Sequence, residues 1–242
     1  MPYYMKTVIA GDTKEVSKIQ SARYGRKGIP RNINIHSTPE AVEKVNYKHA
    51  EAKLRWLINS NFKFNDIHLV LTYQKGKRPS PQESKKYLEK FLRDLRALYR
   101  KQGQELQYIS VTEYQNKAIH HHLVINSFDM RLITPLWPYG RARPTFLDDT
   151  GQYGQLASYL IKETSKTYQL EDAPYGKRWN ASRNLKQPEV SMEIVERGSW
   201  RKEPQATVGY YLEKDKIVNG ISEITGYPYQ FYSMVKIQRR RI

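Results

Sequence analysis

Three consecutive histidines, His120 to His122, lie inside the apolar segment AIHHHLVIN. Side chains alternate between the two faces of a strand, so His120 and His122 would share one face and His121 would point to the other. Two imidazoles on one face can bind the same cation. A strand with one hydrated face can also carry histidines for structural reasons alone. The run therefore predicts either a metal site or a structural strand, with His121 packed or hydrogen-bonded on the opposite face.

Glu113 adds a carboxylate to the metal hypothesis. It is the next-to-last residue of the strand-like segment LQYISVTEY, and a tight turn at residues 115–116 would join that segment to the histidine strand as a hairpin. Glu113 would then pair with Ala118 and share the face of His120 and His122. Two nitrogens and one carboxylate, with coordination positions left open, suit Mn²⁺ or Mg²⁺. A register slip of one residue would turn the carboxylate away.

A second pair of chemically capable residues, Tyr159 and Lys162, lies in GQYGQLASYLIKETSK, which predicts a helix at about 152–166. Residues three apart share one face of a helix. A lysine beside a tyrosine favours the phenolate and can orient an attacked phosphate. The alternative is a core aromatic residue beside a hydrated lysine. Tyr153 lies about 120° round this helix from Tyr159, so we do not expect both tyrosines to share a site.

The elements that must position these residues predict an α+β fold, with a central antiparallel β-sheet flanked by helices. Thr38 and Ser80 are the expected N-caps of two helices, and Ser80 has capping-box spacing to Glu83. The expected strands are residues 1–10, 66–73 and the two arms of the hairpin, and the expected helices are residues 38–59, 80–103 and 152–166. Residues 14–34 are polar and basic, and they predict a loop or arm.

We expect one structural domain overall. Residues 1–60 would form an N-terminal strand, the basic arm and a helix, and residues 61–190 would form the core that carries the histidines and the tyrosine. Residues 191–242 would form a C-terminal extension packed on that core.

The net charge indicates a polyanionic partner. The 242 residues include 41 Lys and Arg against 24 Asp and Glu, a formal charge of +17, and nucleic acid is the commonest partner for such a field. The 19 tyrosines would suit stacking on single-stranded bases. No membrane partner is expected, because neither a long apolar stretch nor a basic amphipathic helix is present. The absence of cysteine excludes thiolate metal sites and fits a reducing cytoplasm.

Two basic segments could bind DNA. The first contains Arg23, Arg26, Lys27 and Arg31, and the second contains Lys177, Arg178, Trp179, Arg183 and Lys186. The second segment combines phosphate-binding charge with a stacking surface. The alternatives are a disordered basic linker for the first and a hydrated loop with a core-anchoring tryptophan for the second.

The order of three motifs, DIHLVLTY, IHHHLVIN and YLIKET, resembles the HUH endonuclease superfamily, in which U is a bulky hydrophobic residue. His121 occupies the U position, which departs from the strict pattern. The combination is similar to single-tyrosine rolling-circle replication initiators (Rep proteins) of phages and plasmids. Conjugative relaxases and single-tyrosine transposases share the chemistry, but the relaxase tyrosine usually lies near the N-terminus. A non-enzymatic basic DNA-binding protein is the alternative from another class.

This resemblance implies an HUH endonuclease fold, with the catalytic tyrosine on a helix beside the histidine strand. It implies that His120, His122 and Glu113 hold a divalent metal, while Tyr159 attacks a single-stranded origin and Lys162 stabilises negative charge. The products would be a 5′-phosphotyrosine and a free 3′-hydroxyl, and reversal would rejoin the strand. The implied partners are single-stranded DNA, adjacent duplex or hairpin DNA, and a host helicase and polymerase in a bacterial cytoplasm.

Overall fold

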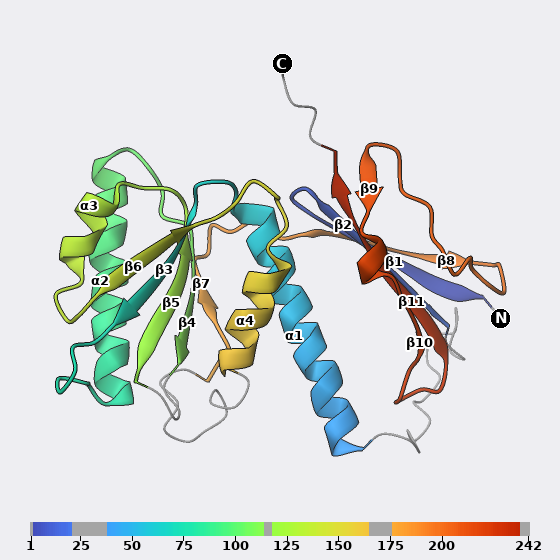
Figure 1. Ribbon diagram of the computed structural model, residues 1–242, viewed down its shortest axis with the longest axis horizontal. Helices are drawn as coiled ribbons and strands as arrows, with labels where there is room; N and C mark the ends of the chain where they lie inside the picture. Colours follow the sequence, from blue (N-terminus) through green and yellow to red (C-terminus); the bar gives the residue numbers. More distant parts are fainter. Residues whose placement is uncertain (1, 21–37, 114–117, 165–175, 238–242) are drawn as a thin grey trace. The chain divides into compact units, whose positions relative to one another are not determined.

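The computed structural model describes residues 2–20, 38–113, 118–164 and 176–237 (Figure 1). The chain divides into two compact units, one formed by residues 1–60 with 187–242 and the other by residues 61–186. This division differs from the single domain expected from the sequence. The two end segments of the chain form one unit together.

The unit formed by residues 61–186 is built on an antiparallel sheet. Its strands are β3 (Ile67–Thr72), β4 (Tyr108–Glu113), β5 (His120–Ile125), β6 (Ala142–Phe146) and β7 (Asn180–Ala181). They lie side by side in the order β6-β3-β5-β4-β7 (Figure 1). The helical elements are α2 (Pro81–Lys101), α3 (Met130–Ile133), the short 3-10 helix η1 (Thr134–Leu136) and α4 (Gly154–Thr164). The predicted α+β class, an antiparallel sheet flanked by helices, is confirmed.

One face of this sheet forms the main hydrophobic core with α2. Alternate residues of β3 and β5 point to this face, and α2 covers them with a single apolar stripe. The core includes Ile67, Leu69, Leu71, Leu123 and Ile125 from the sheet and Leu88, Phe91, Leu92, Leu95 and Tyr99 from α2. The capping box of Ser80 and Glu83 is present, as the spacing predicts. The opposite face carries His120 and His122, so the core fixes the strands that position these two residues.

The second unit contains the other sheet, with strand order β10-β11-β2-β1-β8 and β9 paired to β11. Its elements are β1 (Tyr3–Ala10), β2 (Thr13–Gln20), α1 (Pro39–Asn61), β8 (Glu189–Val195), β9 (Tyr210–Leu212), the 3-10 helix η2 (Lys214–Lys216), β10 (Val218–Ile221) and β11 (Pro228–Lys236). Residues of the expected C-terminal extension thus pair with the first two strands of the chain. Among the described residues, no helix combines the length and the apolar character needed to cross a membrane.

Strand β2 corrects part of the sequence prediction, since residues 14–20 were assigned to a loop or arm. The strand can contain buried polar side chains because these side chains form hydrogen bonds with residues far along the chain. Glu15 accepts hydrogen bonds from Arg55 (2.6 and 2.8 Å) and from Trp56 Nε1 (2.7 Å) on α1. Lys18 donates to Gln230 Oε1 on β11 at 3.0 Å. Buried polar groups that are paired in this way are compatible with a strand interior.

Candidate metal centre and adjacent tyrosine

The hairpin register places Glu113 directly opposite His120 and Val111 opposite His122. The expected pairing of Glu113 with Ala118 was therefore wrong by two residues. Residues 114–117, where that turn was expected, lie outside the described residues. A shift of two positions leaves each side chain on its original face. The predicted face-sharing of the carboxylate and the outer histidines therefore holds despite the different register.

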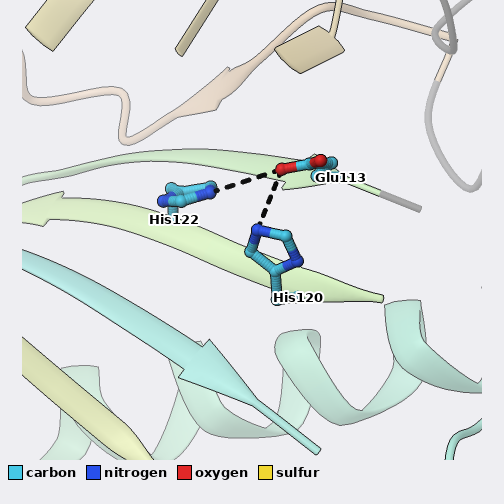
Figure 2. A group of neighbouring side chains, drawn as sticks. All are labelled: Glu113, His120 and His122. Carbon is cyan, nitrogen blue, oxygen red and sulfur yellow. Dashed lines mark ion pairs between the residues drawn. The ribbon is translucent and has the colours of Figure 1, made fainter. Parts of the chain in front are cut away.

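Glu113, His120 and His122 converge on one point at the end of β4 and the beginning of β5 (Figure 2). Glu113 Oε2 lies 2.9 Å from His120 Nε2 and 3.9 Å from His122 Nε2. One potential ligand atom from each residue lies within 4.8 Å of the other two. Glu113 and His122 are buried, while His120 is partly accessible. The three residues form a cluster that could hold a metal ion.

The hydrogen bonds of the two histidines orient their Nε2 atoms for coordination. His120 Nδ1 lies 2.7 Å from the Ala118 carbonyl oxygen. A carbonyl can only accept, so Nδ1 donates this hydrogen bond, and Nε2 is the ring nitrogen that faces Glu113. His122 Nδ1 lies 3.2 Å from His68 Nε2 on β3. Burial lowers the pKa of His68 to about 4, so this ring is neutral and can accept a hydrogen bond from His122 Nδ1–H.

The donor set, two imidazole nitrogens and one carboxylate, could hold a divalent metal ion. Bonds of about 2.1 Å at an octahedral ion place neighbouring ligand atoms ~3 Å apart. The 2.9 Å between Glu113 Oε2 and His120 Nε2 matches this spacing. An isolated buried anion is costly, so a metal cation bound at this point would stabilise the buried Glu113 carboxylate. The fully buried His121, by contrast, points to the core face.

His121 has a structural role on that face. Its Nδ1 lies 2.9 Å from Thr112 Oγ1, and its Nε2 lies 2.8 Å from the Tyr73 hydroxyl. Burial lowers the pKa of His121 to about 3, so the ring is neutral. A neutral imidazole with both nitrogens hydrogen-bonded is stable in a core. This explains how a histidine can occupy a core position between the two outer histidines.

Tyr159 lies beside the cluster on α4. Its ring centroid is 5.3 Å from that of His122 and 6.5 Å from that of His68, with the rings edge to face in both pairs. The side chain is 43% exposed, so a ligand can reach it from solvent. Lys162 is exposed on the same helix, three residues further along. Tyr153 is buried and donates to the Asp148 carbonyl at 3.0 Å, consistent with its expected exclusion from the site.

The structure describes only some of the residues that were predicted to bind DNA. The basic arm, with Arg23, Arg26, Lys27 and Arg31, lies outside the described residues. The second basic segment flanks β7, the edge strand beside β4. Its exposed members are Lys177, Arg183 and Lys186, while Arg178 and Trp179 are partly buried. The pairing of β3 with β5 brings a further residue, His68, into contact with His122.

The segment from β3 to α4 contains the cluster of Glu113, His120 and His122 as well as Tyr159 and Lys162. Searches of the curated proteins and of the solved structures returned no significant match. Residues 66–168, which span this whole segment, match the family model described as replication-associated protein ORF2/G2P.

Proposed function

We propose that this chain initiates rolling-circle replication by nicking and rejoining single-stranded DNA at an origin. The observation that carries the proposal is the edge-to-face contact of Tyr159 with His122, a member of the candidate metal cluster. A residue that could attack a phosphate thus lies beside three residues that could hold a metal. The family match of the same segment supports a role in DNA replication.

Each residue of the site has a role in the proposed reaction. Glu113, His120 and His122 would hold Mn²⁺ or Mg²⁺, which when bound offsets charge on the scissile phosphate. The Tyr159 oxygen attacks phosphorus, and the bond from phosphorus to the 3′-oxygen breaks. The phenol gives up its proton, and the departing 3′-oxygen takes one up as a hydroxyl. Lys162 favours the phenolate and the charged phosphate. Because one phosphoester replaces another, the reverse reaction rejoins the strand without ATP.

The proposed partners follow from the charge and from the products. The net charge of +17 favours binding to the DNA backbone, and the two predicted basic segments would recognise an origin and its adjacent duplex or hairpin. The free 3′-hydroxyl is a primer for a host polymerase. The sequence contains no GxxxxGK[ST] motif of an ATP-driven motor, so unwinding would require a host helicase.

The test is a denaturing gel after incubation of the protein with Mn²⁺ and a pool of single-stranded DNA that includes the natural origin. We expect a slower-migrating band that resists denaturation, which is the tyrosyl-DNA adduct. Parallel lanes would contain EDTA, Tyr159→Phe, His122→Ala and, as a matched control, Tyr153→Phe. The band should persist only in the Tyr153→Phe lane among these controls.

Two outcomes would contradict parts of the proposal. A band that survives Tyr159→Phe would assign the attack to another tyrosine. Tight DNA binding that survives chelation, without any covalent product, would favour a non-enzymatic DNA-binding protein. A relaxase or a single-tyrosine transposase would give the same adduct, and the identity of the cleaved sequence distinguishes these from an initiator.

A further inference from the structure

Strand β6 forms one edge of the sheet that carries the metal cluster, and it was not expected from the sequence. Arg143 on β6 pairs with Val70 on β3, which in turn pairs with His122 on β5. Just before β6, the Arg141 carbonyl accepts the Thr72 N–H at 2.9 Å, and Thr72 pairs with His120. Each of the two histidines is therefore aligned, across β3, with one arginine: His122 with Arg143 and His120 with Arg141.

The arginine side chains point to the face of the metal cluster. Paired residues of an antiparallel sheet project to the same side, which places Arg143 with Val70 and His122. Between the two arginines, Ala142 packs against the main core on the opposite face, as alternation requires. Pro144 follows in β6, and proline is tolerated in edge strands because its missing N–H costs no ladder hydrogen bond there.

This part of the face is open to solvent. Helix α4 packs against β4, and Val111 and Val124 on this face are buried. Val70 and Thr72 on β3 remain partly accessible, and both arginines are exposed. Within the part of the chain that the structure describes, neither guanidinium forms an ion pair. A partly accessible strip of sheet thus runs from His120 across β3 to the two arginines at the edge.

We infer that Arg141 and Arg143 bind phosphates of the DNA strand next to the scissile phosphate. The inference rests on the proposed function and assigns the path of that strand, across β3 toward β6. Two strand spacings separate the Arg143 and His122 Cα positions by ~10 Å, and a long arginine side chain spans much of this distance. Guanidinium groups bind phosphate through paired, charge-assisted hydrogen bonds. The arginines position the strand and take no part in the chemical step.

The test compares two double variants that remove the same charge, both in a Tyr159→Phe background that cannot form the adduct. The first is Arg141→Gln with Arg143→Gln. The matched control is Arg93→Gln with Arg100→Gln, which changes two exposed arginines of α2 on the opposite side of the sheet. Fluorescence anisotropy of a labelled oligothymidylate, over a range of salt concentrations, gives the affinity and its salt dependence.

We expect the Arg141/Arg143 variant to bind about tenfold more weakly than the control. Its slope of log affinity against log salt should decrease by about 1.4, which corresponds to two lost phosphate contacts on a single strand. Mn²⁺ affinity should be the same in both. Equal losses in the two double variants, or no loss in either, would overturn the inference. Failure of the nicking assay leaves this binding comparison unaffected, so the two proposals fail separately.

Discussion

The orientation of the His122 ring depends on a residue that is not itself a candidate ligand. His122 Nδ1 lies 3.2 Å from His68 Nε2, and the two rings stack with centroids 5.4 Å apart. A proton on His122 Nδ1 leaves the Nε2 lone pair directed to the cluster. The neutral state of His68, with its pKa lowered to about 4, preserves its acceptor. His68 therefore positions His122, as hydrogen-bond partners of metal-bound histidines commonly do.

We predict that His68→Phe weakens Mn²⁺ binding by about 10–100-fold, the usual effect of losing such a partner. Phenylalanine retains a ring beside Tyr159 but has no acceptor for His122. His68→Gln offers an amide oxygen in place of the imidazole nitrogen, so its loss should be smaller. Titration of the free Mn²⁺ signal by electron paramagnetic resonance measures the affinity. Equal Mn²⁺ affinities in the wild type and in His68→Phe would show that this contact is only a packing contact.

At the scale of elements, the helices and the central strands could be predicted because their signals are local. Ser80 and Glu83 define the start of α2, and alternation separates His121 from its neighbours. The shared face of Glu113 and His120 was also predictable, since only the parity of the register matters for it. The register of β4 and β5 could not be predicted in this way, because it depends on the turn that joins the two strands. The sequence alone therefore identified the three residues of the cluster but not the cross-strand register that brings them together.

The strands that were missed owe their existence to distant partners. β6 contains arginine and proline, and its place in the sheet comes from pairing with β3. β8 and β11 add to β1 and β2 from the far end of the chain. Strand propensity reflects such packing more than any local preference, so a polar segment that pairs at an edge resembles a loop in sequence.

Helix α4 positions Tyr159 through the buried residues on its other side. Ala157 is fully buried on α4, and a larger side chain there would displace the helix. We predict that Ala157→Leu lowers the free energy of unfolding by about 1–3 kcal/mol and reduces formation of the covalent adduct more than it reduces Mn²⁺ binding. Ser158→Leu is the matched control, because it adds the same side chain at an exposed position. If both variants form the adduct equally, the packing of α4 does not control the tyrosine.

On the scale of the whole molecule, the candidate metal cluster and the paired chain ends belong to different units. The three cluster residues, together with His68 and Ala118, which hydrogen-bond to the two histidines, belong to the unit of residues 61–186. The other unit has its own small core of Val16, Tyr232 and Met234. Each unit therefore buries apolar residues of its own, which is the physical basis for separate stability.

This division gives a prediction for Met234→Ala, which truncates a buried side chain in the unit of the paired ends. The variant should lose about 2–5 kcal/mol of stability in that unit and should bind Mn²⁺ with the wild-type affinity. Leu123→Ala, the matched control, removes a buried side chain of β5 itself and should weaken Mn²⁺ binding. In calorimetry, Mn²⁺ should raise the Tm only of the transition that belongs to residues 61–186, because a ligand stabilises the unit that binds it. Weaker Mn²⁺ binding in Met234→Ala would instead show that the two units are energetically coupled.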